Sequence, residues 1–119
     1  MRALAFGLCL LAGCGGDADR MAAALTGGDP GRGRTALRAY GCGSCHRIPG
    51  VRGARAAVAP PLEGMARRWY IAGVAPNTVP NLIDWVRHPQ HVVPGNAMPE
   101  LGVSDGDARD IAAYLYTLR

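Results

Sequence analysis

The stretch Gly41 to Gly50, GCGSCHRIPG, places two cysteines and a histidine within five residues. Three kinds of site use a Cys-x-x-Cys pair: a metal knuckle, a redox-active dithiol and a covalent haem attachment. Each kind demands something different from the rest of the chain. The choice between them therefore depends on residues outside this stretch.

The N-terminus has the layout of a secretory signal. Residues 1–14, MRALAFGLCLLAGC, carry one arginine before an apolar run that ends in small residues and is too short to span a bilayer. Its end, LAGC at 11–14, resembles the bacterial lipobox, which implies cleavage before Cys14 and lipid attachment to its sulfur. We expect a signal peptide at 1–13, a lipidated tether at 14–28 and a folded domain at 29–119. An ordinary signal peptide or a misassigned start codon is the alternative.

This processing would leave two thiols for chemistry. Cys9 would leave with the signal and Cys14 would be acylated, so Cys42 and Cys45 remain. A structural zinc site normally needs four ligands, and no second cysteine pair is present. A thioredoxin-like dithiol requires a βαβ pattern, whereas the segment before Cys42 has a helical pattern. Export to an oxidising compartment would still permit a disulfide.

The domain has helix signals and no alternating β-branched run that could form a sheet, which predicts an all-α fold. Three helices are expected. Asp29 caps the first, with Pro30 at its start and Gly41 at its end. The other two follow caps at Thr78 and Ser104, and the last runs to Leu118. The proline-rich segment 88–102, HPQHVVPGNAMPELG, is predicted to be a shaped loop. The expected apolar faces are Ala36, Leu37 and Tyr40; Leu82, Ile83 and Val86; and Ile111, Ala112, Leu115 and Leu118.

Cys42, Cys45 and His46 form the attachment motif of c-type haem. Thiols three residues apart lie about one helical turn apart, close enough to add to two neighbouring vinyl groups, and the next residue can direct its imidazole at the iron. Met98 stands between Pro94 and Pro99, which fix the backbone, so its soft thioether is the favoured second ligand. Met21 is expected in the tether and Met65 in the core. His88 and His91 remain as competing ligands.

These motifs resemble the class I cytochromes c over residues 28–118. The matching features are the helix before CxxCH, the turn APPL at 59–62, the segment WVRHP at 85–89, the PGNAM loop at 94–98 and the final helix. The resemblance implies three to five short helices around one haem c held by Cys42 and Cys45. It also implies His46 and Met98 as axial ligands, a hydrogen bond from His46 to the Pro60 carbonyl, and haem contacts from Arg68 and Trp85. Ala59 and Asn96 depart from the family's usual Gly and Thr.

Charge is unevenly distributed along the chain. Residues 32–68 contain eight arginines and one glutamate, whereas residues 69–119 contain three arginines and five acidic residues. The arginines are expected either to form a solvated face or to dock an acidic redox partner. The basic segment lacks interleaved aromatic residues, so no nucleic-acid role is indicated.

His/Met ligation favours one-electron transfer over catalysis, so we expect an electron carrier and not an enzyme. The C-terminal pattern is similar to small cytochromes that feed bacterial haem-copper oxidases. This implies a donor on the periplasmic side of a bacterial membrane that links a quinol:cytochrome c reductase to an oxidase. The alternatives are the cytochrome subunit of a periplasmic dehydrogenase or other oxidoreductase complex, a haem peroxidase, a haem-based ligand sensor and, last, a dithiol module.

Overall fold

The helix before the cysteine motif begins directly after Asp29, the cap that the sequence predicts. A computed structural model describes residues 16–119, and helix α2 spans Pro30–Ala39. The Asp29 carboxylate accepts a hydrogen bond from the Arg32 amide at 2.7 Å, and Pro30 occupies the first turn. Ala36 and Leu37 are buried as expected. Local capping chemistry and an apolar face are thus sufficient to define this helix.

Helix α3, Val79–Arg87, follows the second expected cap. The Thr78 hydroxyl accepts a hydrogen bond from the Asn81 amide at 3.3 Å. The helix buries its three predicted apolar residues, Leu82, Ile83 and Val86. The predicted cap and apolar face of this helix are confirmed.

Helix α5, Asp105–Leu115, differs from its prediction at the C-terminal end. Ser104 caps it as expected, accepting from the Asp107 amide at 3.1 Å. The helix ends at Leu115 and not at Leu118, which lies beyond it and is partly buried against the core. The Asp107 side chain accepts a hydrogen bond from the Tyr40 hydroxyl at 2.6 Å. This acidic residue therefore ties α5 to the end of α2.

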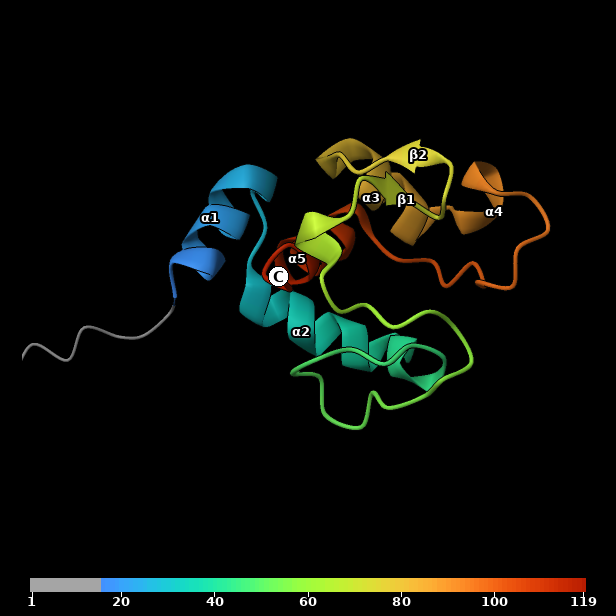
Figure 1. Ribbon diagram of the computed structural model, residues 1–119, viewed down its shortest axis with the longest axis horizontal. Coiled ribbons are helices and arrows are strands. Elements are labelled where there is room, and N and C mark those ends of the chain that lie inside the picture. Colours follow the sequence, from blue (N-terminus) through green and yellow to red (C-terminus); the bar gives the residue numbers. More distant parts are fainter. Residues whose placement is uncertain (1–15) are drawn as a thin grey trace, which may run out of the picture.

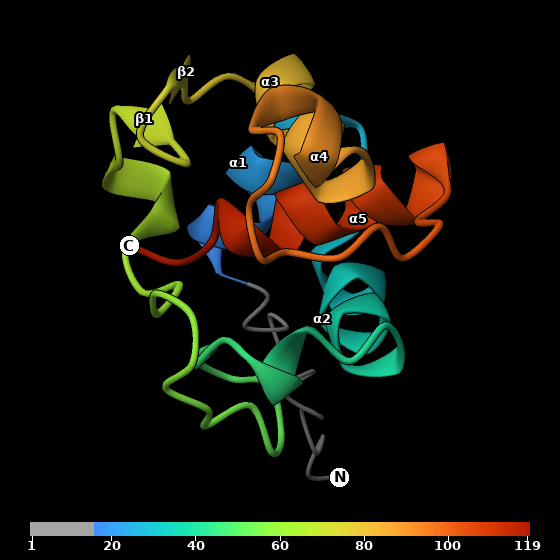
Figure 2. The ribbon, with the colours of Figure 1, turned by 90° about the vertical axis from the view of Figure 1, so that its right-hand side faces the viewer.

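Helix α5 lies at the centre of the domain, with α2 on one side and α3 on the other (Figures 1 and 2). The α2–α5 contact is close because Gly33 has no side chain. A Cβ atom at this position would lie 1.9 Å from the Asp110 carbonyl oxygen. The Asp110 carboxylate also accepts hydrogen bonds from the Asp29 amide at 2.7 Å and from Arg32 Nε at 2.9 Å. The two helices are thus joined by both packing and polar contacts.

The segment 17–28 does not have the conformation expected of a tether. Helix α1, Asp17–Thr26, packs on α5 and buries Ala22 and Thr26, which are one turn apart. Thr26 satisfies its hydroxyl by donating to the Ala22 carbonyl at 2.7 Å. This burial stabilises a helix of ten residues, a length that is marginal in isolation. Cys14 and the expected signal peptide lie outside the described residues.

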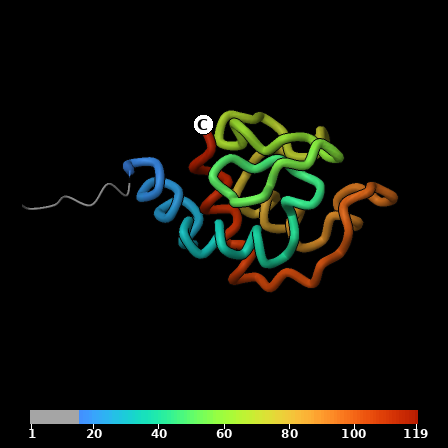
Figure 3. Tube along the Cα trace, turned by 90° about the horizontal axis from the view of Figure 1, so that it is seen from below, coloured from blue at the N-terminus to red at the C-terminus, as the bar shows by residue number. Residues whose placement is uncertain are grey.

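A second correction concerns the proline-rich segment, which was expected to contain no helix. Pro89–Val92 form the short helix α4, and the chain then continues as an irregular segment to α5. Pro89 sits at the first helical position, where a proline costs no hydrogen bond, so it begins α4 as well as ending α3. In Figure 3 this segment lies at the end of the molecule opposite α1.

The remaining elements are short. The 3-10 turns η1, Cys42–Ser44, and η2, Met65–Arg67, follow α2, and the two-residue strands β1, Tyr70–Ile71, and β2, Ala75–Pro76, pair antiparallel. Met65 is buried, as predicted for a core residue. With five α-helices in residues 16–119, the domain has the all-α architecture expected of a cytochrome c fold. Within this range no helix has the length and apolar character needed to cross a membrane.

Candidate functional site

The two cysteines of the motif lie on a single tight turn. Gly41 adopts a left-handed conformation, with φ of 75°, that ends α2 and directs the chain into η1. The amides of Cys45 and His46 then both donate to the Cys42 carbonyl, at 3.3 and 3.0 Å. Both thiols are free, with Cys42 half-buried and Cys45 exposed. The turn therefore presents two thiols followed directly by an imidazole.

The imidazole of His46 is oriented by the turn at 59–62. His46 Nδ1 lies 2.6 Å from the Pro60 carbonyl oxygen. A carbonyl can only accept, so Nδ1 carries the proton and Nε2 of the neutral ring keeps its lone pair. Two backbone hydrogen bonds hold the turn alongside the motif, from Ala59 to Cys45 at 2.9 Å and from Leu62 to Arg47 at 2.9 Å. His46 is thus held in the tautomer that can bind a metal through Nε2.

The environment of Cys42 does not suit a dithiol nucleophile. Burial raises the pKa of the Cys42 thiol above its ordinary value. Thiol–disulfide exchange proceeds through the thiolate, and reactive cysteines usually have a lowered pKa. The only paired strands in residues 16–119 are two residues long, so the described chain lacks the sheet of a thioredoxin-like domain. Both observations weigh against a redox role for the bare thiols.

The loop that carries Met98 is held by side-chain amides. Asn96 donates from Nδ2 to the carbonyls of Pro89 and Val93, at 2.9 and 2.7 Å, and its Oδ1 accepts from the Met98 amide at 2.6 Å. Asparagine therefore orders the loop in the place where the family usually has threonine. Met98 is half-buried. Two free thiols, an imidazole with an available Nε2 and a thioether on an ordered loop form a donor set that fits a covalently attached haem.

The two other residues expected near a haem have different surroundings. Trp85 on α3 is half-buried and packs against the hydrophobic core. The Arg68 guanidinium donates to the carbonyls of Pro61 and Glu63, the latter at 3.0 Å. Arg68 thus braces the turn that contains Pro60, the partner of His46. A haem contact from either side chain stays a prediction.

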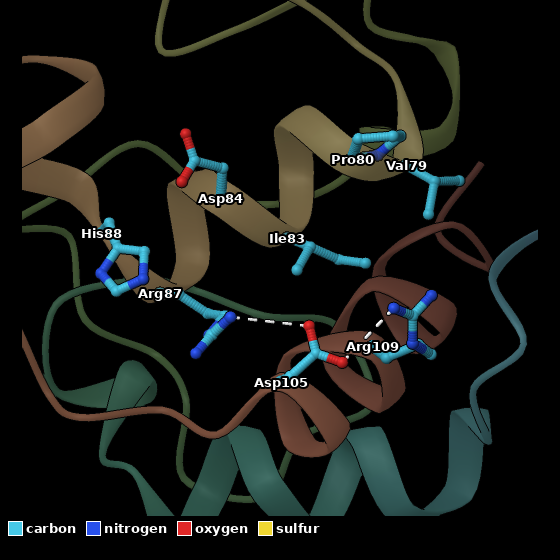
Figure 4. Close-up of a pocket in the computed structure, with 8 residues that line it drawn as sticks. All are labelled: Val79, Pro80, Ile83, Asp84, Arg87, His88, Asp105 and Arg109. Carbon is cyan, nitrogen blue, oxygen red and sulfur yellow. Dashed lines mark hydrogen bonds and ion pairs between the residues drawn. The ribbon is translucent and has the colours of Figure 1, made fainter.

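The competing histidines each face a carboxylate. His88 Nδ1 lies 3.7 Å from Glu100, and His91 Nδ1 lies 3.6 Å from Asp84. Figure 4 shows His88 at one edge of a surface pocket between α3 and α5, in which Asp105 lies between Arg87 and Arg109 at 3.6 and 3.4 Å. Within residues 16–119, no hydrogen bond or ion pair joins either histidine to the cysteine motif. Within this range no cluster of three or more acidic, cysteine or histidine residues could hold a metal ion.

Most arginines of the basic segment carry uncompensated charge. In residues 32–68 only Arg32 and Arg47 form ion pairs, with acidic partners that include Asp110 and Glu63, as far as the structure describes the chain. The other six arginines are Arg34, Arg38, Arg52, Arg55, Arg67 and Arg68. Arg38 and Arg52 flank a shallow hollow beside the cysteine turn. Positive charge therefore lies next to the expected haem attachment site.

Two polar residues at the site were not identified from the sequence. Gln90 on α4 contacts three backbone groups of the Met98 loop. Asn77 donates to the carbonyls of Met65 and Arg68, both at 2.9 Å, and accepts from the Tyr116 hydroxyl at 2.8 Å. Gln90 contacts backbone groups five to eight residues later, and Asn77 contacts backbone groups 9 and 12 residues earlier as well as the Tyr116 side chain. No short motif in the sequence indicates such contacts.

Comparison with known proteins agrees with this geometry. The family model described as Cytochrome c matches residues 31–119, from the first turn of α2 to the C-terminus. Neither the curated proteins nor the solved structures contain a significant match to this chain. The matched region contains the cysteine turn, the His46–Pro60 contact and the Met98 loop, and it covers well over half of the chain. The protein therefore belongs to the cytochrome c family.

Proposed function

We propose that the protein carries single electrons between redox proteins on the periplasmic side of a bacterial membrane, with His46 and Met98 as haem ligands and a terminal oxidase as the acceptor. Membership of the family implies a haem-based electron carrier with redox protein partners, and such proteins are generally not enzymes. When bound, haem c supplies one reversible electron between its ferrous and ferric states. Family membership does not specify the axial ligands, the oxidase as acceptor or the membrane anchor, and we propose these in addition.

The contact between His46 and Pro60 is the observation that carries this proposal. It fixes the Nδ1 proton and leaves Nε2 available as a ligand, directly after two thiols on one turn. A hydrogen-bonded imidazole is also a more basic ligand with a defined ring orientation. With Met98 as the other ligand, no coordination position would be open to oxygen or peroxide. The chain's own residues therefore favour electron transfer over ligand chemistry.

Arginines near the cysteine turn support an acidic partner. Exposed charges of one sign accelerate encounter with a complementary surface more than they strengthen the complex, and salt screens them. We expect the bimolecular rate of electron transfer to an acidic oxidase domain to fall at least about tenfold between low and high ionic strength. A rate that is independent of salt would contradict this role for the arginines.

The packing of α1 makes the proposed anchor short. If Cys14 is lipidated, only three residue steps separate it from Asp17 at the start of α1, a reach of about 10 Å when extended. The haem domain would then stay close to the membrane surface, where a membrane-embedded acceptor presents its docking site. Mass spectrometry of the membrane-extracted protein would detect the acyl chains, and a mature N-terminus elsewhere would contradict the anchor.

The deciding experiment is a visible absorption spectrum of the protein expressed with a cytochrome c maturation system. Haem that survives denaturation together with the weak far-red sulfur-to-iron band would support His46/Met98 ligation. Met98→Ala should abolish that band, and its retention in the variant would reject Met98 as a ligand. Covalent haem without the band would favour His88 or His91, and carbon monoxide binding to the reduced protein would favour a sensor. Absence of covalent haem would favour a dithiol module.

A further inference from the structure

Both the nitrogen and the oxygen of the Gln90 side-chain carboxamide form hydrogen bonds to the loop that carries Met98. Its Nε2 donates to the carbonyls of Asn96 and Met98, at 2.7 and 2.9 Å, and its Oε1 accepts from the Gly95 amide at 3.0 Å. Both amide protons and one oxygen lone pair are thereby satisfied by three backbone groups of one short segment. No other side chain in residues 16–119 makes as many hydrogen bonds to this loop from outside it.

The apolar core gives this loop little support. In the described part of the chain, the buried hydrophobic residues include none between Arg87 and Val103. Pro89 is buried, but it belongs to α4 and not to the loop. The loop follows α4 at the end of the molecule opposite α1 (Figures 1 and 3). Within the polypeptide, this loop is held mainly by hydrogen bonds from α4 and from its own Asn96 side chain.

We propose that Gln90 is a positioning residue that holds the Met98 loop closed and so determines how readily an external ligand displaces the Met98 side chain. This inference rests on the proposed role of Met98 as a ligand. A loop that opens exposes the sixth position, and the apparent affinity of a competing ligand scales with the open fraction. Loss of the three Gln90 contacts raises that fraction, because these hydrogen bonds stabilise the closed loop and are absent from the open one.

The test measures imidazole binding to the oxidised, haem-loaded protein through loss of the far-red band. Gln90→Leu keeps most of the side-chain volume without hydrogen-bonding groups, and Gln90→Glu keeps an acceptor for Gly95 but directs an oxygen at two carbonyls. We expect the apparent imidazole affinity to rise at least about tenfold in both variants, which corresponds to about 1.4 kcal/mol. Hydrogen exchange at the Gly95 amide should accelerate by a similar factor in Gln90→Leu.

Asn81→Ala is the matched control. The Asn81 side chain donates from Nδ2 to the Pro76 carbonyl at 2.9 Å, and neither residue belongs to the Met98 loop. This variant loses a comparable side-chain contact and should change imidazole affinity less than about twofold. An equal rise in the control would show a global loss of stability and overturn the proposal, as would unchanged imidazole affinity and Gly95 exchange in Gln90→Leu. If the wild type lacks the far-red band, the ligand assignment of Met98 fails, and Gly95 exchange alone then decides whether Gln90 holds the loop.

Discussion

Replacement of Gly33 by alanine should weaken the α2–α5 contact at the centre of the domain. An added Cβ would lie 1.9 Å from the Asp110 carbonyl oxygen, 2.5 Å from its carbonyl carbon and 3.0 Å from Tyr114 Cβ. Ordinary contacts are about 3.5 Å, so the helices must separate by about 1.5 Å to accommodate the methyl group. The obstructing oxygen belongs to a helical backbone and cannot rotate away.

The expected loss of stability follows from two opposing terms. Overpacking of this severity costs about 3 kcal/mol, at the upper end of the usual range. Alanine is better than glycine in a helix interior by about 1 kcal/mol. The net decrease in the free energy of unfolding is therefore about 2 kcal/mol, and the midpoint of thermal unfolding should fall by about 10 °C for a domain of this size.

The assay is urea unfolding of the haem-loaded protein at pH 7, followed by circular dichroism at the helix band. Gly106→Ala in α5 is the control, because a Cβ there meets no atom within 4 Å. This control should be neutral or more stable by up to about 1 kcal/mol. If Gly33→Ala matched the wild type or the control, the close α2–α5 approach would not describe the protein in solution.

Three further side chains give predictions that the same unfolding assay can check. Arg32, mainly through its hydrogen bond, lowers the pKa of the Asp110 carboxyl. The contribution of the ionised Asp110 carboxylate to the free energy of unfolding is therefore fully present above the ordinary pKa of about 4, and it is lost as the pH falls through the lower pKa of the folded state. Asp110→Asn should therefore make the free energy of unfolding less dependent on pH in that acidic range. Tyr40→Phe removes the hydroxyl that donates to Asp107 and should lower the midpoint urea concentration of unfolding, whereas no change would imply that water replaces the contact. Asn77→Ala removes two donors to backbone carbonyls and one acceptor and should cost about 2 kcal/mol; a loss under 0.5 kcal/mol, roughly a surface effect, would contradict a bracing role.

The sequence predicts structure best where the conformation depends on neighbours along the chain. Asp29, Thr78 and Ser104 each accept a hydrogen bond from an amide three residues later, as their positions before an apolar run predicted. The CxxCH turn is equally local, since residues 42–46 close it by themselves. Capping and turn formation need no information about distant residues, so a single sequence is sufficient to predict them.

Predictions failed where distant packing decides the conformation. Residues 17–26 contain good helix formers but are too few to form a stable helix in isolation, and α1 is stabilised because Ala22 and Thr26 are buried where the helix packs on α5. Helix α4 is only four residues long, below the length at which periodicity is visible. The role of Gln90 follows from the return of the chain after α4, which brings the backbone of Asn96 and Met98 within reach of its amide.

The fold supports the two sides of the proposed haem site in different ways. The His46 side follows α2, which is joined to α5 by the close approach at Gly33 and by the Asp110 hydrogen bonds, so it is coupled to the global stability of the domain. Within the polypeptide, the Met98 side lies outside the hydrophobic core and is held by amide contacts from Gln90 and Asn96. A segment held in this way can open at a lower free energy than global unfolding. Denaturant or heat should therefore release the Met98 side before the α2–α5 contact breaks, and the far-red band should be lost ahead of helicity.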